Sequence, residues 1–253
     1  MNLHKINHPV GNLRVGIIKN IAFFLEWILF KFLSIFLKLK VKENQIVISR
    51  SIYAPWKKDK QFISIYDKIK HLTLLDIVRL YTLWNASKQV KKKNGIILDI
   101  GCLLGGVGYL LSKNNKQTTY LIDSFSGYKD NDKFFKKQKL FFTNLNLVKD
   151  NTKQLGLKKI KILKGYFPYD FKNKFKKSKI KLCHLDVNTY KSTKDSFAFV
   201  KDNIVKGGYI IFDDYGTYGA KGIINLVDDL KKKYSSDFIF FNNFYGQMLL
   251  IKK

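Results

Sequence analysis

The sequence predicts an α/β fold built on a mostly parallel, doubly wound sheet of seven strands, with additional helices before it. From Gly95 onwards, short apolar runs alternate with helical stretches, and this βαβ alternation is typical of a parallel sheet. The last two apolar runs are so close in sequence that they should pair antiparallel. With 253 residues, 46% of them hydrophobic, the chain is long enough to bury a large core.

Residues 1–45 form the first predicted segment. The stretch from Val15 to Lys38 predicts an apolar helix, but charges interrupt it, so no uncharged run approaches the roughly 18–20 residues of a membrane span. A signal peptide is disfavoured because no small-residue cleavage site follows the apolar part. At 100° per residue, the polar residues share one sector roughly 140° wide: Lys19, Asn20, Glu26, Lys31, Ser34 and Lys38.

Two interpretations of this amphipathic helix remain open. In the first, it lies on an anionic membrane surface and holds the protein near a lipid-linked sugar substrate. In the second, it packs against the domain or against a sister subunit of a homo-oligomer. The membrane interpretation places aromatic residues in the acyl boundary: Phe23, Phe24, Trp27, Phe30 and Phe36.

Residues 46–93 are predicted to be a helical cap and lid segment. An ordered loop around Pro55 is followed, from about Gln61, by two helical stretches. The second shows apolar residues at helical spacing, which predicts a stripe that faces the core: Leu74, Ile77, Val78, Tyr81 and Trp84.

Residues 94–253 are predicted to be the sheet domain. Its strands are expected at 95–100, 118–123, 159–165, 180–187 and 207–214, followed by a helix at 219–234 and a hairpin formed by 238–241 and 247–252. Parallel strands closed by such a hairpin are the pattern of enzymes that use S-adenosylmethionine (SAM). We therefore predict a Rossmann-like class I SAM-dependent methyltransferase fold.

The first strand runs into the glycine-rich stretch "LDIGCLLGGVGYLL". Gly101, Gly105 and Gly106 would let the backbone approach a ligand at this strand-to-helix turn. The second strand ends at Asp123, where nucleotide-binding folds place an acid on the ribose hydroxyls. The two features together predict a ligand that carries adenosine. The alternative is a tight turn with an unrelated acid.

Carboxylates also end the fourth and fifth predicted strands. Asp186 follows "KLCHL", and Asp213 with Asp214 follows "GGYIIF". If these parallel strands are neighbours, the three carboxylates converge at the edge where such sheets bind ligands. They would repel one another without a hard cation, and oxygen ligands suit Mg²⁺. The alternative is that they serve as capping and turn residues.

Several of these stretches, taken in order, resemble the macrocin O-methyltransferase-like (TylF/MycF) family over roughly Ser51 to Lys252. They include "YAPWKKDKQFISIYDKI", "LDIGCLLGGVG", "YLIDSFSGY", "HLDVNTYKSTKD", "IVKGGYIIFDDYGTYGAKGI" and "YGQMLLIKK". That family methylates sugar hydroxyls of macrolides and aminocoumarins. The resemblance implies a SAM-dependent, Mg²⁺-assisted O-methyltransferase with a sugar substrate.

The resemblance also implies site residues. Asp186, Asp213 and Asp214 match the metal ligands, and Asp186, Asn188 and Asp213 are expected to form the catalytic set. Tyr53 and Trp56 match a mobile lid over the substrate. Gly101, Asp123 and Gly165 match cofactor positions, and the predicted cofactor set is completed by Asp99, Gly105, Gly106, Ser124, Tyr166 and Asp186.

Asn188 departs from the family pattern. It stands where a second acid, thought to be the general base, usually follows the first, and an amide cannot take up a proton. The metal can lower the hydroxyl pKa enough for water or a metal-site carboxylate to take the proton, the substrate can differ, or the domain can be a non-catalytic relative that only binds SAM. The nearby His184 is expected to be a hydrogen-bonded core residue.

The charge balance points to a lysine-rich surface. The chain has 47 Lys and Arg against 19 Asp and Glu, a formal net charge of +28, yet only Arg14, Arg50 and Arg79 are arginines. Phosphate and guanine recognition favours arginine, so a nucleic-acid partner or RNA methylation is the less favoured hypothesis. The two cysteines, Cys102 and Cys183, do not form a secreted disulfide framework, which favours the cytoplasm, with possible attachment to the inner membrane face.

Overall fold

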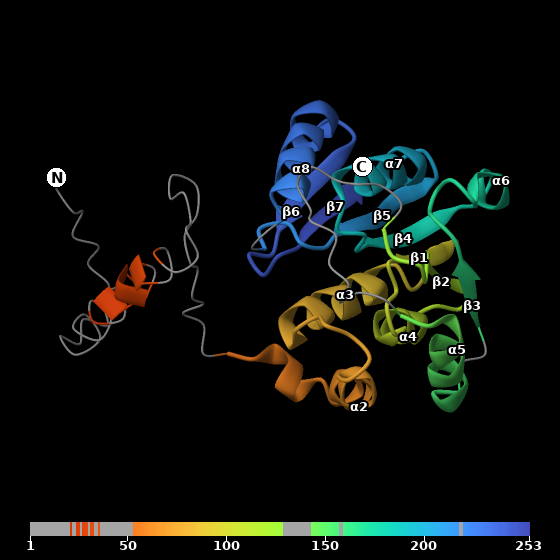
Figure 1. Cartoon of the computed structure of the whole chain (residues 1–253), viewed down its shortest axis with the longest axis horizontal. Coiled ribbons are helices and arrows are strands. Elements are labelled where there is room, and N and C mark those ends of the chain that lie inside the picture. The colour runs from red at the N-terminus through yellow and green to blue at the C-terminus, as the bar shows by residue number, and fades with distance from the viewer. Residues whose placement is uncertain are drawn as a thin grey trace. The chain divides into compact units, whose positions relative to one another are not determined.

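The structure is a computed structural model that describes residues 53–128, 143–156, 159–217 and 220–253, together with nine helical positions between Ile21 and Ile35 (Figure 1). The chain divides into two compact units, Met1–Ala54 and Pro55–Lys253.

The second unit is built on a seven-stranded sheet of order β3-β2-β1-β4-β5-β7-β6. Strands β1 to β5 are parallel, whereas β7 pairs antiparallel with both β5 and β6. The predicted sheet with its C-terminal antiparallel hairpin is therefore confirmed. The strands are β1 Ile96–Ile100, β2 Thr119–Asp123, β3 Ile160–Lys164, β4 Ile180–Leu185, β5 Ile204–Phe212, β6 Phe238–Asn242 and β7 Met248–Lys252.

Helices cover both faces of the sheet (Figure 1). The α2, α3 and α4 helices pack on one face against side chains such as Ile97 and Leu182. The α7 and α8 helices pack on the other face against alternate side chains of the same strands, such as Leu98 and Cys183. The helices are η1 Pro55–Lys58, α2 Lys60–Ile69, α3 Ile77–Gln89, α4 Gly106–Ser112, α5 Leu145–Gln154, α6 Lys172–Phe175, α7 Tyr190–Val200 and α8 Lys221–Tyr234.

Local capping explains where the helices near the site begin. Asp59 caps α2 by accepting a hydrogen bond from the Phe62 backbone N–H, and Asp76 caps α3 by accepting from Val78 and Arg79. Such side-chain caps satisfy backbone donors that the first turn leaves unpaired. The Asp59 carboxylate also accepts a hydrogen bond from the Trp84 indole N–H at 2.9 Å, which ties α2 to α3.

The apolar stripe predicted around the second helix is only partly core. Trp84 is fully buried, and Tyr81 packs against the same cluster. Leu74, however, lies before α3 begins and is 66% exposed, so the prediction that it belongs to the stripe is wrong. The Asp76 cap starts the helix two residues after Leu74, and the leucine is left in the preceding loop.

The first unit is described at nine positions, all of them helical: Ile21, Phe24, Leu25, Trp27, Ile28, Leu29, Lys31, Phe32 and Ile35. The apolar ones among them are 42–76% exposed, and the Lys31 ammonium lies 5.8 Å from the centre of the Trp27 ring. The remaining residues of the predicted amphipathic sector lie outside the described residues. Among the described residues, no helix is both long enough and apolar enough to cross a membrane.

Candidate active site

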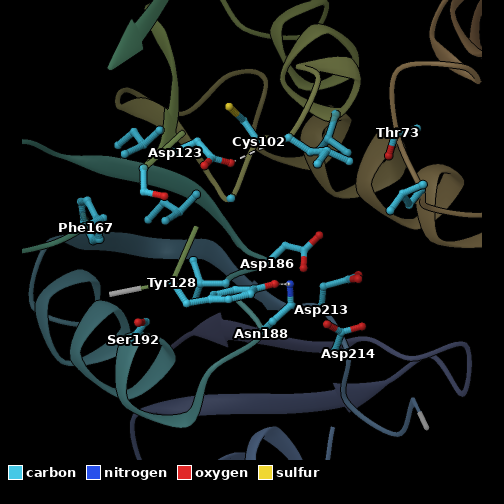
Figure 2. Close-up of a pocket in the computed structure, with 18 of the residues that line it drawn as sticks. Thr73, Cys102, Asp123, Tyr128, Phe167, Asp186, Asn188, Ser192, Asp213 and Asp214 are labelled. Atoms are coloured by element: carbon cyan, nitrogen blue, oxygen red, sulfur yellow. Dashed lines mark hydrogen bonds between the residues drawn. The ribbon is translucent and has the colours of Figure 1, made fainter. Parts of the chain in front are cut away.

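A cavity of about 290 Å³ lies beyond the carboxyl ends of the parallel strands (Figure 2). Its walls come mainly from residues at and after the ends of the five parallel strands β1 to β5, and from the loop between α2 and α3. Figure 2 shows Asp123 and Cys102 in one part of the cavity and Asp186, Asp213 and Asp214 together in another. Cavities at this edge are the usual ligand sites of doubly wound sheets.

Two glycines let the backbone line the cavity closely. Gly101 has φ +86°, and a side chain there would place its Cβ 1.8 Å from the carbonyl oxygen of Asp186. Gly165 has φ +153°, and its Cβ would lie 2.8 Å from a carboxylate oxygen of Asp170. Neither position has room for a side chain, and L residues rarely adopt these backbone conformations.

Asp123 connects two of the cavity loops. Its Oδ2 accepts a hydrogen bond from the Leu103 N–H at 3.1 Å, and its Oδ1 accepts one from the Phe125 N–H at 3.0 Å. Burial raises the pKa of Asp123 despite these bonds. Each carboxylate oxygen can accept a further hydrogen bond, so the side chain can still bind a ligand hydroxyl.

The three carboxylates predicted to converge do so. Strands β4 and β5 are parallel neighbours in which Leu185 pairs with Phe212, so Asp186 and Asp213 follow them at the same level. One ligand oxygen from each of Asp186, Asp213 and Asp214 lies within 4.8 Å of the other two. This oxygen-only set fits a hard divalent cation such as Mg²⁺.

The ionisation of these carboxylates is uneven. Burial, together with the charges of Asp213 and Asp214, raises the pKa of Asp186 well above its ordinary value. Burial and Asp213 likewise raise the pKa of Asp214. Burial alone would also raise the pKa of Asp213, but His184 and Arg79 outweigh it and lower that pKa.

Polar groups surround the Asp213 carboxylate. The Arg79 guanidinium donates to Oδ2 at 2.6 Å, and the Gln247 amide donates to Oδ1 at 2.9 Å. His184 Nε2 lies 3.9 Å from Oδ1, which is too long for a hydrogen bond, so it acts on Asp213 through its charge. Burial would lower the pKa of His184, but Asp213 and Asp99 raise it to about 10.

Asn188 faces the cavity beside Tyr128, as Figure 2 shows. It has φ +57°, a conformation that Asn tolerates better than most residues, and its Nδ2 donates to the Tyr128 hydroxyl at 3.1 Å. Burial raises the pKa of Tyr128 to about 12, so the phenol stays protonated at neutral pH.

The sequence matches the family described as macrocin-O-methyltransferase (TylF) over residues 43–236. The chain belongs to the TylF family. Its membership of this family identifies the protein as a SAM-dependent O-methyltransferase. No curated protein matches the sequence significantly.

Solved structures with the same fold include other methyltransferases. The O-methyltransferase NovP is 18% identical with a TM-score of 0.59, and the match covers 72% of this chain and 82% of NovP. CalS11, a calicheamicin methyltransferase, is 13% identical with a TM-score of 0.58, covering 82% of this chain and 99% of CalS11. An apo structure of CalS11, described as TDP-rhamnose 3'-O-methyltransferase, is 12% identical with a TM-score of 0.51, covering 79% and 96%. At these identities the likeness shows the class I methyltransferase fold.

The TylF-family chain brings most of the predicted cofactor residues to the cavity. Those that line it are Gly101, Asp123, Ser124, Gly165, Tyr166 and Asp186. Asp99, Gly105 and Gly106 do not line it: Asp99 is fully buried below, where it accepts a hydrogen bond from His184 at 2.9 Å. Gly105 caps α4, and the Gly106 N–H donates to the Leu72 carbonyl at 3.1 Å. The expectation that His184 is a hydrogen-bonded core residue is confirmed.

The predicted lid residues are not among those that line the cavity of this TylF-family protein. Trp56 packs edge-on against Tyr81, with 6.0 Å between ring centres. Tyr53 belongs to the first unit and is 59% exposed. Their assignment to a mobile lid stays a prediction.

Sequence reasoning missed Arg79, Tyr128 and Gln247 as residues of the TylF-family site. In the sequence Arg79 is only one of three arginines, and its position just after the Asp76 helix cap was the available signal for it. The fold brings its guanidinium to the Asp213 carboxylate. Tyr128 closes the quoted stretch "YLIDSFSGY", which was the available signal for it. Gln247 lies in the quoted stretch "YGQMLLIKK", but nothing in that stretch indicates its partner, since it reaches Asp213 only through the pairing of β5 with β7.

Proposed function

We propose that this TylF-family protein transfers the methyl group of SAM to a hydroxyl of a sugar, with a divalent ion such as Mg²⁺ held by Asp186, Asp213 and Asp214. The observation that carries the proposal is the convergence of these carboxylates within 4.8 Å, in a cavity whose lining also includes Gly101 and Asp123. One part of the cavity suits an adenosine-bearing ligand, and the other suits a hard cation.

The cofactor position follows from the residues of the first two strand ends. Gly101 and Gly165 let the methionine part of SAM approach the backbone, because neither has a side chain. Asp123 accepts hydrogen bonds from the ribose hydroxyls with its remaining lone pairs. Asp186 lies between this part of the cavity and the other two carboxylates, so a methyl group and an acceptor hydroxyl would meet beside it.

The three carboxylates differ in how readily they ionise before a cation binds. Arg79 and His184 keep Asp213 ionised, so it is ready to act as a ligand. At Asp186 and Asp214, burial and the neighbouring carboxylates outweigh the same two positive groups, so the pKa values of these side chains are raised. A bound divalent ion supplies the missing positive charge and lowers the pKa of a hydroxyl beside it.

Asn188 is proposed to orient the acceptor rather than to deprotonate it. Its Nδ2 is directed to Tyr128, which leaves Oδ1 able to accept a hydrogen bond from an acceptor hydroxyl. The hydroxyl proton then leaves to water or to a carboxylate of the metal site. Asn188 also favours a second candidate function, a relative that binds SAM without turnover.

A sugar is the proposed class of acceptor. The family supports it, and the fold neighbour CalS11 is described as acting on TDP-rhamnose. A lipid-linked form of the acceptor is proposed on the exposed apolar helix positions of the first unit, such as Phe24 and Trp27, because an amphipathic helix with such a face can lie at a membrane surface.

Methyl transfer from isotope-labelled SAM tests the proposal. The full chain would be incubated with nucleotide sugars, glycans and glycolipids in Mg²⁺ or in excess EDTA. We expect a labelled product that disappears with EDTA and in an Asp186→Asn variant. The exposed Asp229→Asn variant on α8 is the matched control and should retain transfer. SAM binding without transfer to any acceptor would favour the non-catalytic relative.

A further inference from the structure

Arg79 is held in a fixed position at the edge of the carboxylate cluster. It lies in the first turn of α3, where its Nε donates to the capping Asp76 at 2.8 Å and its Nη2 to the Leu74 carbonyl at 3.4 Å. The remaining arm, Nη1, donates to Asp213 at 2.6 Å. The Arg79 side chain is 16% exposed and that of Asp213 1%, so water screens this ion pair little.

Both oxygens of Asp213 therefore have a donor. Arg79 occupies Oδ2 and Gln247 occupies Oδ1. The two donors differ in charge: the amide is neutral, whereas a guanidinium stays protonated at every pH a protein tolerates. A cation that uses Asp213 as a ligand must thus bind next to a permanent positive charge.

We propose that Arg79 is the resident counter-cation of Asp186, Asp213 and Asp214, and that it weakens their affinity for a divalent ion. Without the ion, Arg79 neutralises part of a buried cluster of like charges, so the site can fold empty. With the ion, the same guanidinium repels it. The inference rests on the proposed metal site and deepens it: the ion is held weakly by the protein alone, and further ligands from the acceptor would strengthen its binding.

Repulsion outweighs any help that Arg79 gives by orienting Asp213. The carboxylate keeps its orientation through the Gln247 amide at 2.9 Å, and the His184 imidazole lies behind it at 3.9 Å. Gln247 is itself fully buried and accepts a hydrogen bond from Asn243 at 2.9 Å, so it does not depend on Arg79. Removal of the guanidinium therefore removes a charge while Asp213 stays in place.

Calorimetric titration of the full chain with Mn²⁺ and Mg²⁺, in the absence of SAM, tests the inference with three variants. Arg79→Gln keeps a neutral donor toward Asp213, Arg79→Met removes the donor, and Arg79→Lys keeps the charge. We expect the Gln and Met variants to bind the ion about tenfold more tightly than the wild type, or about 1.4 kcal/mol. Arg79→Lys should bind like the wild type.

A Gln247→Met variant serves as the matched control, because it removes the neutral donor from the other oxygen of Asp213 and should not increase ion affinity. Near-ultraviolet circular dichroism establishes that each variant is folded. Arg79→Gln decides the question if Arg79→Met does not fold.

Two results overturn the inference alone: equal or weaker ion binding by Arg79→Gln, or binding by Arg79→Lys as tight as that of Arg79→Gln. Absence of ion binding in the wild type and in every variant overturns the proposed metal site together with the inference. The titration thus separates a failure of the counter-cation role from a failure of the metal site.

Discussion

Replacement by asparagine should change the stability of the metal-free protein in opposite directions at two adjacent residues of the carboxylate cluster, Asp213 and Asp214. Asp214→Asn removes a charge that burial and Asp213 disfavour, as the raised pKa of Asp214 shows. Asparagine suits the site, because Asp214 has φ +62° and its Oδ1 accepts a hydrogen bond from Thr217 at 3.1 Å, which an amide oxygen also accepts. Asp213→Asn instead breaks the ion pair with Arg79.

The size of each effect follows from the geometry. Two like charges within 4.8 Å repel by about 3.5 kcal/mol or more per pair at an effective dielectric constant of about 20. The Thr217 hydrogen bond and the positive charges of Arg79 and His184 offset part of this repulsion at Asp214, so Asp214→Asn should stabilise the metal-free protein by about 1–2 kcal/mol, or about 2–8 °C in melting temperature. Asp213→Asn should destabilise it by about 3 kcal/mol, since Arg79 loses a buried partner.

Thermal and urea denaturation in EDTA, compared with the same experiments in Mg²⁺, measures both effects. The pKa of Asp214 is raised in the folded state, so its ionisation lowers the stability of the folded protein. This loss of stability is absent below the unfolded pKa of about 3.9 and grows as the pH rises through the folded pKa. The stabilisation by Asp214→Asn should therefore grow with pH. The folded pKa of Asp213 is lowered, so its contribution is present above about 3.9 and lost as the pH falls. A metal-free Asp214→Asn protein less stable than the wild type would refute this reasoning.

Three further predictions concern the cofactor, the acceptor and the membrane. Asp123→Ala should weaken SAM binding by about 1.5–3 kcal/mol, as measured by calorimetry, because a charge-assisted hydrogen bond to the ribose is lost; unchanged affinity in a folded variant would contradict the assignment. Asn188→Asp should raise turnover in the labelled-methyl assay if the missing carboxylate limits the reaction, whereas a lower rate would mean that the site is built around the amide. Deletion of residues 1–45 should abolish flotation with anionic liposomes, and a full-length protein that stays in the soluble fraction as a stable dimer would favour the packing interpretation instead.

Much of the sheet could be predicted from the sequence because its strands are buried on both faces. The β4 strand is buried along its whole length from Ile180 to Leu185, and its sequence is a mainly apolar stretch, interrupted by Lys181 and His184, that ends at Asp186. The order of these strands along the chain and the short connection between β6 and β7 are compatible with only a few sheet topologies. The convergence of Asp186 with Asp213 followed from the same reasoning, since parallel neighbours end at one edge.

The helical segment was harder to predict. Hydrophobic spacing alone includes Leu74 in the α3 stripe, but the Asp76 cap begins the helix later and leaves Leu74 exposed beside the cavity. Similarly, the glycine-rich stretch does not show which glycines line the cavity. Gly106 instead lies against the Leu72 carbonyl, because α4 packs closely under the loop that precedes α3.

The fold class, the TylF-family membership and the three acids at the strand ends follow from the sequence alone, because each depends on local patterns or on the order of elements along the chain. What surrounds those acids depends on how distant segments pack together. Arg79 and Asp213 are separated by 134 positions and Gln247 and Asp213 by 34, so no local pattern records their contacts. The lowered pKa of Asp213 and the raised pKa values of its neighbours arise because burial removes water, and within such a site the nearest charges decide which carboxylate stays ionised.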